Sequence, residues 1–354
     1  MIGLGVALCL AAGGFGARPL YVPGIALPLL AVGATVWVSA AVRGARVIRS
    51  LESRAVEEDM PLRVSVCVTR SGVPLPGAEA RPWAGGPAQP LSGSLSGDAP
   101  VSASARFPRR GRQALPPASV LISDPLGLCR RTILSAGDDV LVLPRVEPLR
   151  FAEVDGPGAN LRRRRAGAAE AGAADVDSLQ PHQPGAPASR IHWPTVARTG
   201  TLMERRLVAE SARSPFLVVD PREPASADAL DRAMRAAASL CVHLARGGGC
   251  AVVLPGDRRP TRIDGELYGF SELHARLALL HPDAGGPPLG LLIGATTVLW
   301  VTAATHRPAS LAALRAPLRY LISPHPAAHW PVRFTAAGCG GQQLSRDTAS
   351  QRVA

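Results

Sequence analysis

The sequence contains no lysine, and all 39 basic residues among its 354 are arginine. Together with the abundance of alanine, glycine and proline, this absence indicates a GC-rich coding bias as much as a functional choice. The formal net charge of +12 is therefore weak support for nucleic-acid binding, although a basic protein still favours anionic surfaces. We expect no specific nucleic-acid partner.

The sequence also lacks the short motifs that carry enzyme chemistry. It has no Gly-x-Ser-x-Gly, P-loop, His-Glu-x-x-His or Gly-x-Gly-x-x-Gly signature in a suitable context. Its six cysteines include no Cys-x-x-Cys pair, which excludes a zinc knuckle and a thioredoxin-like motif. Small buried hydrophobes in a reducing compartment are the preferred interpretation of these cysteines, with disulfides as the alternative. We therefore predict a protein that is not an enzyme and has no cofactor.

The N-terminal 45 residues contain two apolar stretches. Residues 24–42 carry no charge, and at helical rise they are long enough to cross a hydrocarbon core of roughly 30 Å. Residues 2–14 are apolar but shorter, about 20 Å as a helix. A cleaved secretory signal is the alternative for this opening stretch, but it lacks a basic start and another apolar span follows at once. We predict a transmembrane helical hairpin over residues 1–45, with the lipid bilayer as partner.

The arginines that flank these stretches predict an orientation. The turn between them holds only Arg18, whereas four arginines follow the second stretch, namely Arg43, Arg46, Arg49 and Arg54. By the positive-inside rule, the rest of the chain lies in the cytoplasm. The expected location is the inner (cytoplasmic) membrane.

Residues 58–150 show strand patterns. In residues 62–69, apolar side chains alternate with polar or small ones, which is typical of a half-buried strand. Residues 101–107, 119–123 and 140–143 are further strand candidates, separated by turns rich in glycine and proline. We predict a small antiparallel β-sandwich. The run Arg109, Arg110 and Arg112 is expected to be a solvated strand end, with an anion site as the alternative.

The second half of the chain alternates between strand and helix patterns. An Ala/Gly/Arg-rich segment, residues 151–177, predicts a flexible linker. After it come expected strands at 216–219, 250–254 and 297–302 and expected helices at 227–244 and 270–280. This alternation predicts an α/β domain over residues 178–340 with a mostly parallel sheet, followed by a disordered tail at 341–354. Ligands bind such sheets at the carboxyl ends of the strands, where Asp220 lies.

Three phrases of this sequence resemble the DUF58 family of bacterial proteins. Residues 190–202 read Arg-Ile-His-Trp, then Ala-Arg, then Gly-Thr-Leu; residues 124–128 read Asp-Pro-Leu-Gly-Leu, and residues 144–146 read Pro-Arg-Val. The resemblance covers nearly the whole chain. It implies a membrane-anchored protein whose last domain is similar to a von Willebrand factor A (vWA) module. The partners it implies are a MoxR-type AAA ATPase and a transglutaminase-like membrane protein.

The first of these phrases supplies the candidate docking residues. They are Arg190, His192, Trp193, Ala197 and Arg198. The structural alternative is a turn locked by a buried indole, with the arginines paired to carboxylates such as Glu204 or Asp220.

A vWA-like module that binds metal needs Asp-x-Ser-x-Ser, whose carboxylate and hydroxyls are hard oxygen ligands. The corresponding residues here are Asp220, Arg222 and Pro224, so a guanidinium and a proline replace the two hydroxyls. Neither coordinates a cation, and we predict a degenerate site without metal.

Three functions remain open. The leading interpretation is a membrane-anchored scaffold or interaction protein in an envelope-related system. The second is a metal-dependent vWA-type binding module. The third is an unrecognised hydrolase with His192 as general base, for which no nucleophile is recognisable nearby.

Overall fold

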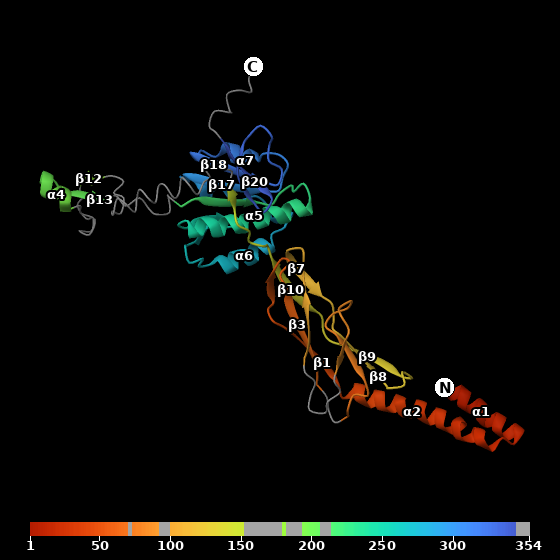
Figure 1. Ribbon diagram of the computed structural model, residues 1–354. Coiled ribbons are helices and arrows are strands. Elements are labelled where there is room, and N and C mark those ends of the chain that lie inside the picture. The colour runs from red at the N-terminus through yellow and green to blue at the C-terminus, as the bar shows by residue number, and fades with distance from the viewer. Residues whose placement is uncertain (70–72, 92–99, 152–178, 182–192, 206–213, 345–354) are drawn as a thin grey trace. The chain divides into compact units, whose positions relative to one another are not determined.

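The computed structural model describes residues 1–69, 73–91, 100–151, 179–181, 193–205 and 214–344 (Figure 1). The chain divides into two compact units. The first comprises residues 1–108 and 112–142, and the second comprises residues 109–111 and 143–354. From residue 152 onward, the predicted linker lies outside the described residues.

The first unit begins with a helical hairpin, α1 (Ile2–Phe15) and α2 (Tyr21–Arg43), joined by the 3₁₀ turn η1 (Arg18–Leu20). The two helices run side by side because glycines face the partner helix (Figure 1). A Cβ atom added to Gly5 would lie 2.5 Å from Pro28 Cδ, and one added to Gly24 would lie 2.6 Å from Cys9 Sγ. Among the described residues, only the segment Arg18–Arg43 is long and apolar enough to cross a membrane, with a mean hydropathy of 2.1.

The carboxyl end of α2 belongs to the core of the following β-domain. Val38 and Ala41 are 0% and 3% exposed and pack with the strand residues Val66 and Val120. Trp37 also donates its indole N–H to the carbonyl of Pro74, at 3.1 Å. Helix α2 is therefore shared between the apolar hairpin and the β-domain.

The β-domain contains three small sheets. Their strand orders are β1-β3-β6, β5-β4-β8-β9 and β2-β10-β7. The strands are β1 (Arg46–Leu51), β2 (Ala55–Glu57), β3 (Leu62–Thr69), β4 (Ala78–Arg81), β5 (Gln89–Leu91), β6 (Val101–Ala105), β7 (Gly111–Leu115), β8 (Ser119–Ser123), β9 (Arg130–Leu134) and β10 (Asp138–Leu143).

The first two of these sheets are antiparallel and share one core. The expected alternation of β3 is confirmed, since Leu62, Val64, Val66 and Val68 are buried. The predicted start at residue 58 is too late, because β1 already begins at Arg46. Arginines hide the strand pattern of β1 in the sequence, and one of them points into the protein.

That arginine is Arg49, whose side chain is 1% exposed. Its Nε donates to Asp138 at 2.7 Å, and its terminal nitrogens donate to the carbonyls of Leu115, Pro116 and Ala136. A guanidinium carries five donors, and here they bind together loops that are far apart in sequence. Arg49 is therefore a structural residue and not a surface charge that marks orientation.

The second unit is built on an eight-stranded sheet of order β11-β19-β20-β18-β17-β14-β15-β16. Its strands are β11 (Arg150–Phe151), β14 (Phe216–Asp220), β15 (Cys250–Val253), β16 (Thr261–Ile263), β17 (Thr297–Thr302), β18 (Leu318–Ser323), β19 (Val332–Ala336) and β20 (Cys339–Leu344). Parallel pairing is confined to the central strands β15, β14, β17 and β18. The flanking pairs are antiparallel, so the prediction of a mostly parallel sheet is wrong at both edges.

The predicted disordered tail begins too early. Strand β20 continues to Leu344, which is 3% exposed. The glycines of this segment suggest a chain end in the sequence, but the ring of Phe334 packs where a Cβ atom of Gly341 would lie. Residues 345–354 lie outside the described residues.

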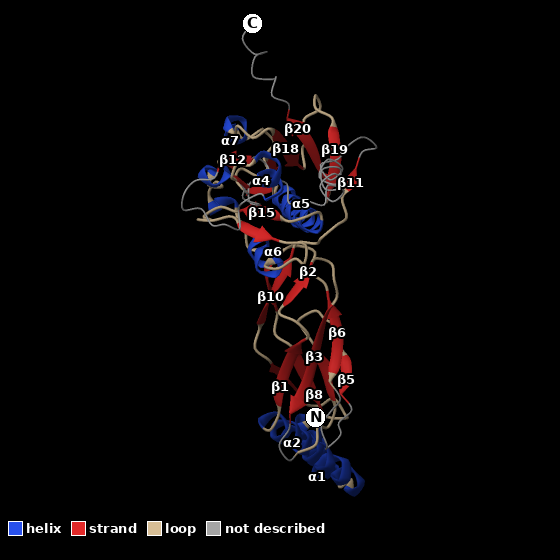
Figure 2. Ribbon diagram, turned by 90° about the vertical axis from the view of Figure 1, so that its left-hand side faces the viewer, coloured by secondary structure: helices blue, strands red, loops and turns tan. Residues whose placement is uncertain are grey.

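Helices cover both faces of this sheet. Helices α5 (Ala227–Arg246) and α6 (Phe270–Ala278) pack on one face, over a core that includes Cys241, Cys250 and Cys339 (Figure 2). Segments around η5 (Leu289–Leu292) and α7 (Ala309–Ala313) cover the other face. The remaining elements are the short turn η4 (Pro282–Ala284), the helix α4 (Trp193–Thr199) and the antiparallel pair β12 (Leu179–Pro181) and β13 (Met203–Arg205).

Residues 109–111 also belong to the second unit, where Arg110 is not solvated as expected. Its side chain is 5% exposed and pairs with Asp231 at 2.9 Å. It also donates to the carbonyls of Leu277 and Leu280, at 2.8 and 3.0 Å. A cation is favoured beside the unsatisfied carbonyls at a helix C-terminus, here that of α6.

Candidate binding site

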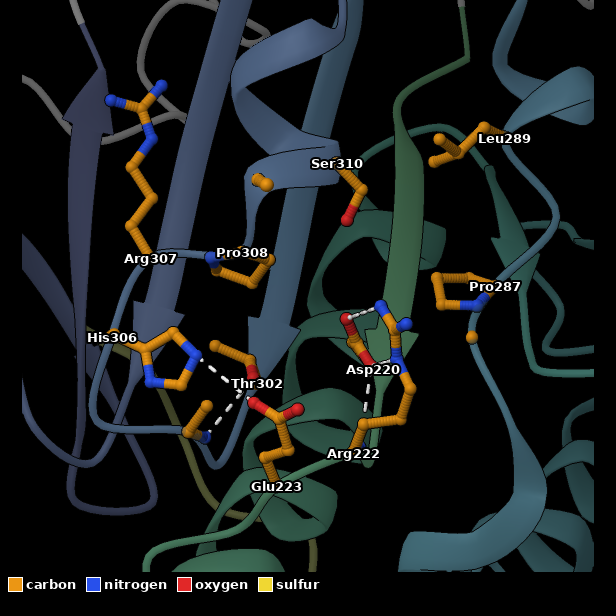
Figure 3. A pocket seen from close by; sticks show the side chains of 13 residues that line it. Asp220, Arg222, Glu223, Pro287, Leu289, Thr302, His306, Arg307, Pro308 and Ser310 are labelled. Carbon is orange, nitrogen blue, oxygen red and sulfur yellow. Dashed lines mark hydrogen bonds and ion pairs between the residues drawn. The ribbon is translucent and has the colours of Figure 1, made fainter.

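The carboxyl ends of β14 and β17 lie side by side at one edge of the eight-stranded sheet. The two strands are parallel, and Asp220 lies opposite Thr302 in their register. The loops that follow the strands enclose a cleft of about 490 Å³. Figure 3 shows the side chains around it, which include Asp220, Arg222, Glu223, Thr302, His306 and Ser310. This is the edge at which the sequence predicts a ligand site.

An ion pair occupies the centre of the cleft. Asp220 is 2% exposed, and the Arg222 guanidinium donates from Nε to Oδ1 and from Nη2 to Oδ2, both at 2.8 Å. This two-pronged geometry is the strongest form of an arginine–carboxylate pair. The hydrogen bond to Asp220 raises the pKa of Arg222 above its ordinary value. Both carboxylate oxygens therefore face a permanent cation that belongs to the protein.

The same guanidinium remains open on its other side. The Arg222 side chain is 45% exposed, and its Nη1 makes no hydrogen bond to the described residues. The backbone of Gly286 passes close by, since a Cβ atom there would lie 2.9 Å from Arg222 Cζ. In Figure 3 the side chain of Ser310 points toward the pair. Arg222 is thus held in place with one nitrogen available to a ligand.

A second polar pair links the two loops of the cleft. His306 Nε2 lies 3.1 Å from Glu223 Oε2, and both side chains are largely exposed. Such an exposed pair adds little stability. Glu223 has a left-handed backbone (φ 49°), a conformation that is rare for residues other than glycine. Strain of this kind costs about 1 kcal/mol or more and concentrates at functional sites.

At the position where a vWA-like module would bind a metal ion, the structure has the Asp220–Arg222 ion pair. Asp220 and Arg222 form the centre of the cleft, and Pro224 lies in the same loop. Within the part of the chain that the structure describes, no group of three or more His, Cys, Asp or Glu side chains is arranged to hold a metal ion. The absence of a metal remains a prediction.

The predicted docking residues are only partly described. Trp193, Ala197 and Arg198 lie on α4 and are exposed. Trp193 is 61% exposed, but the pairing of Arg190 with Glu204 lies outside the described side chains, so the alternative of a locked turn stays a prediction. Arg190 and His192 lie outside the described residues. The carboxylate of Asp220 pairs with Arg222, a partner that the sequence did not suggest.

The phrase at residues 124–128 serves a structural turn. Asp124 is 4% exposed, and its carboxylate accepts hydrogen bonds from the backbone N–H groups of Leu126 and Cys129. Such turns use aspartate because its short side chain reaches its own backbone.

Sequence reasoning missed the residues that follow β17. Thr302, His306 and Ser310 line the cleft together with the residues that follow β14. The rule that drew attention to Asp220 applies equally to residues 302–310, which lie at and after the end of the neighbouring parallel strand β17.

Comparison with known proteins adds no relative. No protein-family model matches the sequence, and a search of curated proteins returns no match.

Proposed function

We propose that this chain is a membrane-anchored, non-enzymatic interaction protein that binds a partner at the carboxyl edge of its α/β sheet without a metal ion. The Asp220–Arg222 pair carries the proposal, because the guanidinium engages both oxygens that a divalent cation would need. A fixed guanidinium with an open edge is well suited to hydrogen-bond a carboxylate or carbonyl of a partner.

The membrane anchor is proposed from helix α2. Its length and apolar composition suffice for a span, and α1 packs against it. Removal of α2 as part of a signal would also remove Val38 and Ala41 from the β-domain core. This supports a helix that stays in the mature protein. The arginines after it, without the buried Arg49, favour a cytoplasmic location for both domains.

Alkaline carbonate extraction and protease protection test the anchor. We expect the full chain in the membrane pellet, with α2 intact by mass spectrometry. A tag at the C-terminus should resist protease added to spheroplasts. Release of the chain by carbonate, or a mature N-terminus beyond residue 43, would contradict the anchor. Digestion of the tag would show that the domains lie on the opposite side of the membrane.

The partner is proposed from the resemblance to DUF58 proteins, which makes a MoxR-type AAA ATPase the first candidate and a transglutaminase-like membrane protein the second. Features that support a vWA-like domain are the parallel central strands, the helices on both sheet faces and an aspartate at the strand edge. In this arrangement the cleft belongs to a docking surface, and the chain itself performs no chemistry.

A capture experiment from host membranes tests this function. Detergent-solubilised wild type, Arg222→Gln, Arg198→Ala and the control Arg258→Gln are compared, each with Mg²⁺ and with EDTA. Arg258 is an exposed arginine outside the cleft. We expect an ATPase with the wild type and the control in both buffers, and at least tenfold less with Arg222→Gln.

Other outcomes separate the alternatives. Capture that needs Mg²⁺ would favour the metal-dependent module. Capture that Arg198→Ala abolishes and Arg222→Gln preserves would move the docking surface to α4. If no protein is captured by any variant that remains folded, the proposed function is wrong.

A further inference from the structure

A second pocket lies at the same sheet edge, between the carboxyl ends of β17 and β18. Its volume is about 380 Å³, within the range of small-molecule sites. The loop after β17, the end of β18 and the loop around Trp330 enclose it. In Figure 3 the side chain of Arg307, which lines this pocket, extends away from the Asp220–Arg222 pair.

Every ionisable side chain that lines this second pocket is basic. These side chains are His306, Arg307, His325 and His329. The first cleft shares His306 and Arg307 with this pocket, but it also contains Asp220 and Glu223. Glu223 pairs with His306, and no carboxylate is among the residues that line the second pocket with Arg307.

Arg307 is partly buried, and no carboxylate of the described part of the chain pairs with it. Its Nε is enclosed by protein and has no hydrogen-bond acceptor among the described residues. Burial, and then the nearby charge of Arg319, lower the pKa of Arg307. The guanidinium lies over the indole of Trp330, at 5.5 Å from the ring centroid. Stacking on an aromatic face leaves the donor edge of an arginine free for an oxyanion.

Buried hydrogen bonds hold the walls of the pocket in place. Gln342, 1% exposed, donates to the carbonyls of Ala327 and Trp330 at 2.6 and 2.7 Å and accepts from the N–H of Ala327 at 3.0 Å. Ser323 donates to the carbonyl of Ala304 at 3.3 Å and accepts from the backbone N–H of His325 at 3.0 Å. A preformed pocket binds more tightly because less conformational entropy is lost on binding.

We propose that this pocket binds a carboxylate through the Arg307 guanidinium, with the carbon skeleton of the ligand against Trp330 and Leu321. A carboxylate matches the donor edge of a single guanidinium, which engages two oxygens side by side. The carboxylate belongs either to a small organic acid or to the C-terminus of a peptide. The inference rests on this pocket alone and does not depend on the proposed protein partner.

Calorimetric titration of the detergent-solubilised full chain tests it. The probes are benzoate, N-acetyl-Ala-Ala, the amide of that dipeptide and inorganic phosphate. We expect wild type to bind benzoate, the dipeptide acid or both, and to bind the amide at least tenfold more weakly. Binding of benzoate alone identifies a small acid, and binding of the dipeptide acid alone identifies a peptide terminus.

Three variants assign the binding to the pocket. Arg307→Gln should weaken carboxylate binding at least tenfold, and the control Arg315→Gln, at an exposed arginine, should leave it within twofold. Thr305→Trp, at an exposed residue that lines the pocket, should block entry while all charges are retained, so it replaces Arg307→Gln if that variant does not fold.

Four results would overturn the inference. They are binding to neither acid, equal binding of acid and amide, phosphate binding tighter than that of both acids, and unchanged binding in folded Arg307→Gln or Thr305→Trp. Because no protein partner enters this experiment, its failure is distinguishable from failure of the capture experiment.

Discussion

Two arginine–aspartate pairs, one in each unit, use the same chemistry for different ends. In the β-domain, the Arg49 side chain is 1% exposed and donates hydrogen bonds to Asp138 and to backbone carbonyls. In the α/β domain, Arg222 is 45% exposed, gives two donors to Asp220 and keeps Nη1 open. Exposure and the number of remaining donors therefore distinguish a structural arginine from one available to a ligand.

The exposure of the acidic partner is reversed between the two pairs. Asp138 is 37% exposed and Asp220 is 3% exposed, both measured on the side chain. Loss of Arg49 removes a nearly buried donor from Asp138 and from three carbonyls, whereas loss of Arg222, which is 45% exposed, lets water reach the carboxylate of Asp220. An unmade hydrogen bond costs more when water cannot replace the partner. The comparison thus predicts different effects for the same substitution.

The largest effect is expected for Arg49→Gln. Because a nearly buried guanidinium loses its charge-assisted hydrogen bonds to Asp138 and to three carbonyls, the β-domain should lose about 3 kcal/mol of stability. Hydrogen exchange read by mass spectrometry should show opening of β3 increased on the order of a hundredfold, with β14 unchanged. Arg54→Gln, at an exposed arginine of the same unit, is the control. A change below threefold in β3 would show that Arg49 is not a structural residue.

Hydrophobic patterns predicted those elements whose faces are clearly divided. The pattern of β3 and the boundaries of α5 and β17 agree closely with the structure. Strand β1 was not predicted, because the buried Arg49 looks like a surface residue in the sequence. The antiparallel edge strands were not predicted, because β20 is rich in glycine and the ring of Phe334 packs on its Gly341. In these places, tertiary contacts override the local pattern.

The sequence predicted the position of the cleft but not the contacts within it. Spacing alone placed Asp220 at a strand end, because buried parallel strands end at a common edge. That Arg222 turns back onto Asp220 depends on the loop conformation, including the close approach of Gly286. The basic pocket beyond it joins residues 302–330 from two loops and a strand, and no local sequence pattern brings these together.

The double variant Arg222→Ser/Pro224→Ser tests whether the guanidinium stands in for a cation. It restores Asp-x-Ser-x-Ser and frees the Asp220 oxygens, so we expect Mg²⁺ binding that the wild type lacks. At about tenfold excess over the dissociation constant, Mg²⁺ should stabilise the variant by about 1.4 kcal/mol. The measurement is the shift in thermal unfolding with Mg²⁺ against EDTA. No shift in a folded variant would show that the loop geometry does not suit a metal.

Arg222→Gln should destabilise the α/β domain by about 1 kcal/mol or less, because the Arg222 side chain is 45% exposed and water that takes its place solvates Asp220. Hydrogen exchange in β14 should therefore change by less than about tenfold. The same variant should lose partner capture, which separates binding from stability. A loss comparable to that of Arg49→Gln would make Arg222 a structural residue as well, and would erase the distinction between the two pairs.

The smallest effect is expected at Glu223, the residue after Arg222. Glu223→Gly removes the cost of a left-handed conformation, and it also removes an exposed pair with His306 that contributes little. The α/β domain should gain about 0.5 kcal/mol, measured as the free energy of opening of β14 by hydrogen exchange. Glu223→Gln, which removes the charge but keeps the strain, should give no gain. A stabilisation by Glu223→Gln alone would mean that charge, and not backbone strain, disfavours glutamate at this edge of the cleft.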